Sequence, residues 1–251
     1  MRTIISLLLL LAGVNSLEAE RMQFQSATNR AVMLELYSSE GCSSCPPAEA
    51  WFSQLKSNSR LWNGLVPIAF HVDYWDYLGW RDPFATAAFS ERQRAYAALW
   101  KSESVYTPGF VLNGKEWRGW YNRNGLPRVS SATPGTLTAN SEDGKNWKVR
   151  FAPTSRSAGG YDIHLALLGF ELSSDVKAGE NRGHRLDHDF VVLAMQSATA
   201  SIGGGSLSAE ISATVPSKFS PKRLAIAVWV TKRGELEPVQ AVGGWLTPTK
   251  G

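Results

Sequence analysis

The sequence predicts an α/β N-terminal domain followed by a mostly antiparallel, sandwich-like β domain. Residues 31–72 contain an apolar run, a polar turn, a helical pattern and a second apolar run, which is a βαβ unit by length. From residue 136 onward, apolar stretches alternate with Gly- and Asn-rich turns, as in antiparallel sheets. The change in composition near residues 133–135 therefore predicts domains over 27–133 and 134–251.

The N-terminal elements follow from periodicity and turn chemistry. Residues 31–37 and 65–72 are nearly continuous apolar runs, typical of strands in a sheet that is covered on both faces. Between them, residues 46–56 should form a helix, because proline suits a first helical turn. A capping box at Ser90 and Gln93 predicts a second helix that runs to Trp100, and Asn113-Gly114 between apolar runs predicts a hairpin.

The C-terminal half reads as a series of strands with one long polar loop. The predicted strands are 147–151, 163–170, 190–195, 207–215 and 224–231, and the loop covers residues 178–189. The spacing favours a sandwich or a barrel-like module.

The bulk composition is that of a soluble globular protein and excludes one class of partner. The chain has 251 residues, 43% of them hydrophobic, and a net charge of +4 from 26 basic and 22 acidic residues. The basic residues are scattered, whereas nucleic-acid binding requires a basic face. We expect no nucleic-acid partner and no cofactor.

The first residues have the pattern of an export signal. Arg2 precedes an apolar stretch that is too short to cross a bilayer as a stable helix, and small residues follow it. We expect a signal peptide over residues 1–19, cleaved after Ser16 or Ala19. The mature protein should then be periplasmic or secreted, without stable membrane insertion, in a compartment where thiols are not kept reduced.

The sequence contains only two cysteines, Cys42 and Cys45, in a Cys-Ser-Ser-Cys motif. The motif follows a strand and opens a helix, whose N-terminus lowers the pKa of a nearby thiol. Cys42 should attack a substrate disulfide, and Cys45 should resolve the mixed disulfide. The prolines after Cys45 disfavour helical backbone at that cysteine, which weakens the expected effect.

Other residues complete the expected redox site. Thr107-Pro108 directly precedes a strand, where thioredoxin-like folds place a cis-proline beside the CxxC motif. Glu35, a lone acid in an apolar strand, is either a proton-transfer group for Cys45 or an edge-facing or salt-bridged residue. The expected substrate groove adds residues at the carboxyl end of the second strand, where open α/β sheets bind ligands: His71, Asp73, Tyr74 and Trp75. The alternatives are that His71 is buried and satisfies a backbone partner, and that the aromatic residues belong to the core.

A metal site is not expected. His184, Asp187, His188 and Asp189 lie in the predicted polar loop, and His-x-x-x-His aligns two imidazoles only on a helix. No Gly-x-Ser-x-Gly motif supports a serine hydrolase either.

Several longer strings resemble the DUF1223 family, a bacterial secreted family with a thioredoxin-like fold and no settled function. The resemblance rests on residues 35–49, 69–80, 89–96 and 105–108, and on Gly179–Gly183 with Leu186–His188. It covers most of the chain after the signal and implies a fold and a role for the CxxC motif, but no substrate.

We therefore predict an exported thiol–disulfide oxidoreductase with a redox-active disulfide. Its partners would be a protein or small-molecule disulfide substrate and a redox partner protein. Two alternatives stay open: a protein that handles copper or zinc through the CxxC thiolates, and a non-catalytic binding module with a static disulfide.

Overall fold

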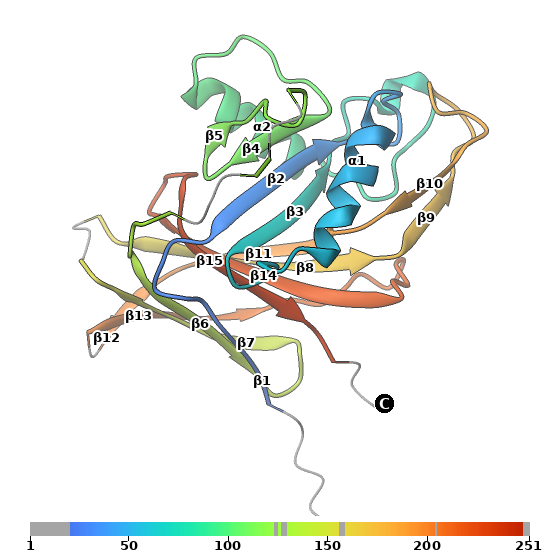
Figure 1. Cartoon of the computed structure of the whole chain (residues 1–251). Coiled ribbons are helices and arrows are strands. Elements are labelled where there is room, and N and C mark those ends of the chain that lie inside the picture. The colour runs from blue at the N-terminus through green and yellow to red at the C-terminus, as the bar shows by residue number, and fades with distance from the viewer. Residues whose placement is uncertain (1–20, 123–124, 127–129, 156–158, 204, 248–251) are drawn as a thin grey trace, which may run out of the picture.

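The computed structural model describes residues 21–122, 125–126, 130–155, 159–203 and 205–247, so the expected signal peptide lies outside the described residues. Its strands form an eight-stranded sheet, a five-stranded sheet and a two-stranded arm (Figure 1). In spatial order, the eight-stranded sheet contains β15 (Pro238–Trp245), β14 (Arg223–Lys232), β8 (Tyr161–Phe170), β11 (Val191–Thr199), β3 (Leu65–His71), β2 (Val32–Ser38), β4 (Gly109–Leu112) and β5 (Lys115–Glu116). The five-stranded sheet contains β1 (Met22–Gln25), β6 (Gly135–Ser141), β7 (Asn146–Pro153), β13 (Ser206–Ser212) and β12 (Ser201–Gly203). The arm pairs β9 (Leu172–Asp175) with β10 (Arg185–His188).

The predicted fold class, a thioredoxin-like α/β domain followed by a separate β sandwich, is wrong. Strands make up 44% of the structure and helices 13%. The described residues contain two α-helices, α1 (Cys45–Ser53) and α2 (Ala87–Leu99), with the short 3₁₀ segments η1 (Gln54–Ser57) and η2 (Asp76–Leu78). The physical reason lies in the pairing of β11, which is parallel to β3 at Val191 and Ala69 and antiparallel to β8. Strands from both halves of the chain thereby form one large sheet.

Two neighbouring strands of that sheet, β8 and β14, show why the prediction of a separate β sandwich is wrong. Residues 165–170 of β8 and 225–231 of β14 are buried on both faces, so these segments are nearly continuous apolar runs. Ala166 and Leu168 face a core that β2 and β3 share, whereas Leu165 and Leu167 face the five-stranded sheet. A single strand thus contributes to two cores.

Several local predictions are confirmed. β2, α1 and β3 form the βαβ unit, with β2 and β3 parallel from Val32↔Leu65 to Ser38↔His71. The Asn113-Gly114 hairpin connects β4 and β5. The capping box is wrong, because α2 begins at Ala87 after the N-cap Thr86, whose hydroxyl accepts a hydrogen bond from the Phe89 N–H. The predicted loop 178–189 is wrong in part, because its residues 185–188 form β10.

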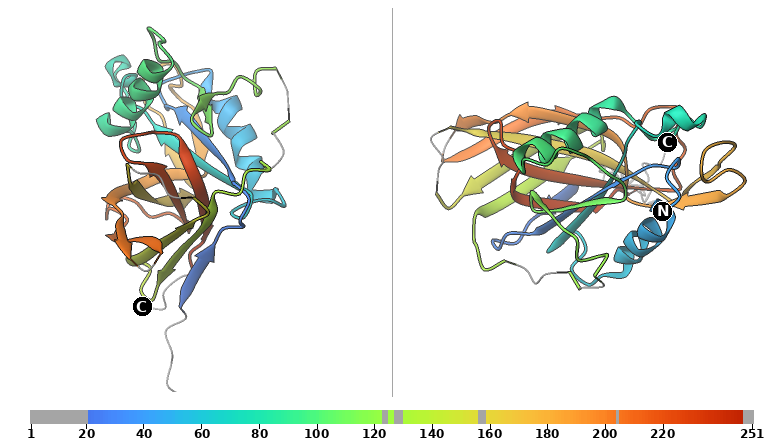
Figure 2. Two further views of the ribbon diagram at one scale, coloured as in Figure 1. Left: turned by 90° about the vertical axis from the view of Figure 1, so that its left-hand side faces the viewer. Right: turned by 90° about the horizontal axis from the view of Figure 1, so that it is seen from above.

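Alternation along β2 separates two chemical environments. The helices α1 and α2 cover opposite faces of the β2–β3 part of the sheet, as the view from above shows (Figure 2). Ser38 contacts Glu49 of α1, whereas Glu35 contacts Arg92 of α2. Residues three apart on a strand point to opposite faces, so these two polar groups belong to different sites.

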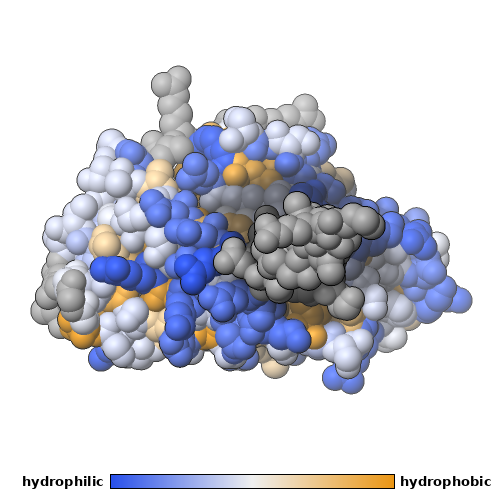
Figure 3. All heavy atoms as spheres, turned by 90° about the horizontal axis from the view of Figure 1, so that it is seen from below, coloured by the Kyte–Doolittle hydropathy of each residue, from blue (hydrophilic) through white to orange (hydrophobic). Residues whose placement is uncertain are grey.

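Among the described residues, no helix is long and apolar enough to cross a membrane. Seen from below, the surface carries hydrophilic residues over much of its area, with apolar residues in separate patches (Figure 3).

Candidate functional site

The two cysteines lie where β2 turns into α1. Cys45 is the first residue of α1, so the expectation that the following prolines keep it out of the helix is wrong. Both cysteines are free, and their exposed fractions are 1% for Cys42 and 0% for Cys45. The residue before Cys42 is Gly41. A side chain does not fit at this position, because a Cβ there would lie 2.8 Å from the Cβ of Trp75.

The expected cis peptide bond between Thr107 and Pro108 is confirmed, and this loop lies against Cys42. As a thiol, Cys42 donates to the Thr107 carbonyl oxygen at 3.6 Å. The Trp75 indole N–H donates to the Thr107 hydroxyl oxygen at 2.8 Å, and the Tyr121 hydroxyl donates to the Pro108 carbonyl oxygen. The structure therefore brings Thr107, Pro108 and Trp75 to Cys42.

The environments of the two thiols make them unequal. A hydrogen bond from the Cys45 thiol lowers the pKa of Cys42 to about 6, against the opposing effect of burial, and the Ser44 and Thr107 hydroxyls add to the lowering. Burial raises the pKa of Cys45 well above its usual value, and donation to Cys42 raises it further. At neutral pH, Cys42 is the thiolate and Cys45 the proton donor.

A chain of buried polar groups lies behind Cys45. The Ser38 hydroxyl donates to the Glu49 carboxylate, which also contacts Nδ1 of His188. On its other side, Nε2 of His188 lies 2.9 Å from the carboxylate of Glu40. Burial opposes protonation of His188, but the charge of Glu49 and the bonds to both carboxylates raise its pKa to about 10. This imidazole is therefore charged at neutral pH.

His71, predicted to line the substrate groove, is 1% exposed and belongs to the same buried cluster. Its Nδ1 lies 2.7 Å from the Asp82 carboxylate, and its ring lies 5.0 Å from that of His188 in an edge-on arrangement. Its Nε2 has no hydrogen-bond partner among the described residues.

The remaining groove residues are half-buried and partnered. The Asp73 carboxylate accepts a hydrogen bond from the Ser90 hydroxyl at 2.5 Å, and the Tyr74 hydroxyl donates to the Gln93 side chain at 3.1 Å. Burial raises the pKa of Tyr74, and the charges of both cysteines contribute, which places this phenol near the thiols.

Glu35 is engaged on the opposite face of the sheet. Arg92 donates to both of its oxygens, at 2.9 and 3.0 Å. Tyr37 and Tyr96 donate to the same carboxylate at 2.9 and 2.6 Å. None of these four hydrogen bonds reaches a cysteine, and together they fit the salt-bridged alternative.

Two parts of the site were not predicted from the sequence. Glu49 lies four residues after Cys45 and thus on the same side of α1, which is a signal that the sequence contains. The segment between β9 and β10 has no such positional signal, although the family resemblance includes its residues Gly179–Gly183. There, Asn181 donates to the backbone oxygens of Glu40 and Cys42, both at 2.9 Å, and Glu180 accepts from the Ser43 N–H and hydroxyl.

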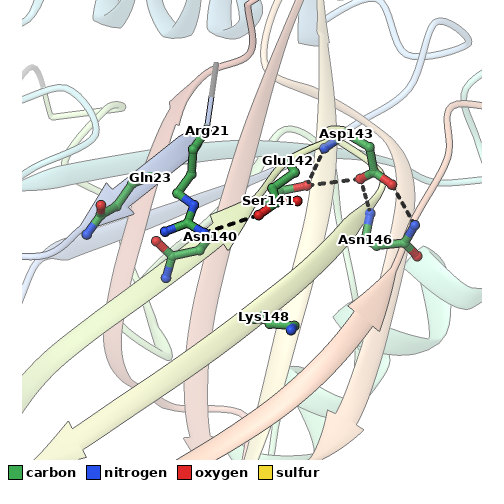
Figure 4. Close-up of a pocket in the computed structure, with 8 residues that line it drawn as sticks. All are labelled: Arg21, Gln23, Asn140, Ser141, Glu142, Asp143, Asn146 and Lys148. Atoms are coloured by element: carbon green, nitrogen blue, oxygen red, sulfur yellow. Dashed lines mark hydrogen bonds and ion pairs between the residues drawn. The ribbon is translucent and has the colours of Figure 1, made fainter. Parts of the chain in front are cut away.

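Two of the surface hollows differ in position, one lying next to the Thr107–Pro108 loop and one on the five-stranded sheet. One of about 410 Å³ is lined by Tyr106, Arg118, Tyr121 and Asn122, next to the Pro108 loop. A second, of about 520 Å³, lies on β1, β6 and the β6–β7 turn (Figure 4). In the second hollow, Arg21 pairs with Glu142, and Asp143 accepts hydrogen bonds from Asn146, so much of the lining is engaged internally.

Comparison with known families identifies the chain. The family model described as "Protein of unknown function (DUF1223)" matches residues 33–231. The chain belongs to the DUF1223 family. The matched region includes the cysteines, the Thr107–Pro108 loop and the β9–β10 arm of this DUF1223 protein, so one family segment contains the whole candidate site.

Two solved structures are similar to this DUF1223 chain. One is the crystal structure of a protein from Agrobacterium tumefaciens, with 25% sequence identity and a TM-score of 0.58, covering 88% of this chain and 95% of that one. The other is HBP35 of Porphyromonas gingivalis, with 12% identity and a TM-score of 0.53, covering 90% of this chain and 80% of that one. The second likeness concerns the fold alone. Among curated proteins, none matches this chain.

Proposed function

We propose that this DUF1223 protein is an exported thiol–disulfide oxidoreductase in which Cys42 attacks and Cys45 resolves. The observation that supports this most directly is the unequal thiol pair at the start of α1, in which Cys45 donates its proton toward Cys42 beside the Thr107–Pro108 loop. A permanent structural disulfide would not require one cysteine to be ionised and the other to stay protonated.

The reaction starts from the reduced pair. The Cys42 thiolate attacks one sulfur of a substrate disulfide, the substrate S–S bond breaks, and the other substrate sulfur leaves as a thiolate. Cys45 then loses its proton and attacks the Cys42 sulfur, which releases the second substrate thiolate and forms the Cys42–Cys45 disulfide. The substrate gains two electrons and the protein loses two. A redox partner protein restores the starting state, and the reverse sequence oxidises a dithiol.

The surroundings of Cys42 suggest how a substrate would bind. The hollow beside Pro108 offers the Arg118 guanidinium and the Tyr106 ring, which stack with a separation of 5.9 Å. A peptide or small disulfide seated there would lie next to the loop that contacts Cys42. Because Cys42 is almost fully buried, the contacts of Glu180 and Asn181 with the CxxC turn must loosen to admit the substrate sulfur.

The decisive experiment compares two single-cysteine variants. Cys45→Ser should accumulate a mixed disulfide with a model disulfide, because the resolving thiol is absent, whereas Cys42→Ser should accumulate none. Mass spectrometry after acid quenching detects the adduct. Equal adduct formation in both variants would contradict the assigned roles.

A redox titration of the wild-type pair separates the proposal from its alternatives. Glutathione buffers followed by thiol alkylation should place the potential above about −300 mV, the range of exchangeable disulfides. A lower potential would support a static disulfide. Tight binding of Cu(I) by a reduced pair that cannot exchange disulfides would support metal handling by the thiolates.

A further inference from the structure

The cluster behind α1 contains three potential metal ligands that the thiol chemistry does not use. Glu49, His71 and His188 each offer one ligand atom, and these atoms lie within 4.8 Å of one another. The three residues come from α1, the end of β3 and the end of β10. Segments that are far apart in the sequence thus converge on one buried position.

The ligand set has the composition of a zinc site. Two imidazoles and one carboxylate are a recurrent Zn²⁺ set, and nitrogen and oxygen donors do not favour Cu(I). His71 supplies the independent sign of a missing ligand, because its Nε2 is buried without a hydrogen-bond partner among the described residues. Since Nδ1 of the same ring is engaged by Asp82, the free nitrogen is available to an ion.

A second layer of carboxylates supports both imidazoles. Asp82 holds His71, and Glu40 lies 2.9 Å from Nε2 of His188. These carboxylates are themselves fixed, because the Glu40 N–H donates to Asp82 and the Trp80 indole donates to Glu40 at 2.7 Å. Metal-binding histidines commonly present their other nitrogen to a carboxylate in this way.

We propose that Glu49, His71 and His188 bind one Zn²⁺ ion, which fastens the β9–β10 arm to α1 and β3. Zinc bonds of about 2.0–2.1 Å place tetrahedral ligand atoms about 3.3–3.4 Å apart. The ion therefore takes the place of the proton between Glu49 and His188 and draws the His71 ring closer. The site differs from the sequence expectation of no metal, and it does not depend on disulfide exchange by Cys42 and Cys45.

The test begins by removing the competing thiolates. The Cys42→Ser/Cys45→Ser protein, treated with a chelator and then dialysed against Zn²⁺, should retain one zinc per chain in elemental analysis. X-ray absorption at the zinc edge should show nitrogen and oxygen ligands with imidazole scattering and no sulfur. A protein that retains no zinc, or a spectrum without imidazole, would overturn the proposal.

Ligand variants in the same background identify the site. His71→Asn retains a donor for Asp82 and removes Nε2, and His188→Gln retains a donor for Glu40 and removes Nδ1. Each should lose at least tenfold in zinc affinity by calorimetry. His184→Asn, which removes an exposed imidazole from the same arm, is the matched control and should bind as the background protein does. Undiminished binding by folded His71→Asn would contradict the site, and the absorption spectrum decides the matter should both variants unfold.

Discussion

Two buried polar clusters lie on opposite faces of the same two strands, and they differ in how completely they are satisfied. On the α2 face, Glu35 accepts four hydrogen bonds, two of them from Arg92. On the α1 face, His188 lies between the carboxylates of Glu49 and Glu40, and His71 contacts Asp82 through one imidazole nitrogen, while its other nitrogen has no partner among the described residues.

This difference distinguishes a fully hydrogen-bonded cluster from one that keeps an unpartnered polar atom. A carboxylate whose lone pairs are all engaged has little capacity left to accept a proton or bind an ion. A cluster with an unpartnered imidazole nitrogen next to the thiols retains that capacity. The same strand therefore carries a group that holds the fold together and, three residues later, one that adjoins the chemistry.

The largest effect should come from breaking the satisfied cluster. Arg92→Met leaves the buried Glu35 charge without its cation and should lower the free energy of unfolding by about 3–5 kcal/mol. Urea denaturation measures the loss. Arg94→Met, which breaks only the exposed pair with Glu91, is the control and should change stability by about 0.5 kcal/mol or less. A loss below about 1 kcal/mol for Arg92→Met would contradict a structural role for the pair.

The second largest effect should be on the pKa and the alkylation rate of Cys42 when Cys45 is removed. The Cys45 hydrogen bond is the main cause that lowers the pKa of Cys42, so Cys45→Ala should raise that pKa. Alkylation of wild-type Cys42 should be flat above a midpoint near pH 6 and fall tenfold per pH unit below it, because only the thiolate reacts. At pH 7 the variant should therefore react at least roughly tenfold more slowly than the wild type. An unchanged midpoint would show that Cys45 does not activate Cys42.

The sequence predicts the local geometry of the site better than it predicts the fold. The strand–helix–strand unit and the turn that carries Cys42 depend on neighbouring residues, which propensity rules describe. The cis peptide bond before Pro108 is expected instead from the place where thioredoxin-like folds have a cis-proline. The parallel pairing between Val191 and Ala69 joins strands from the two halves of the chain into one sheet. No local pattern in the sequence indicates this pairing.

The same limit explains the misassigned polar residues. Both Glu35 and Glu49 are acids near the cysteines in sequence, but the faces of β2 and α1 decide which one approaches a thiol. His188 lies 143 residues after Cys45 in a segment that resembles an exposed loop, yet β10 places it in the core at 1% exposure. Only tertiary packing brings such a residue to the site.

The two clusters should also differ in how their carboxylates affect the pKa of Cys45. In the Cys42→Ser protein, Glu49→Gln should lower the pKa of Cys45, because the Glu49 charge is one of the causes that raise it. Thiolate ultraviolet absorbance as a function of pH measures the shift in chelator-treated protein. Glu35→Gln, on the opposite face, should leave the titration unchanged. An equal shift in both variants would mean that the strand does not separate the clusters.

The smallest effect should come from the arm that closes over the CxxC turn. Glu180 is exposed and accepts two hydrogen bonds from Ser43, so Glu180→Gln should weaken the closed arrangement by about 1 kcal/mol. This corresponds to roughly a fivefold rise in the rate of Cys42 alkylation, measured at a pH where the thiol is fully ionised. The matched control is Glu171→Gln. This residue lies outside the CxxC turn, and its substitution affects only an exposed ion pair with Lys222. Faster alkylation in the first variant alone would show that the arm limits access to Cys42, and equal rates in both would assign that limit to the Thr107–Pro108 loop.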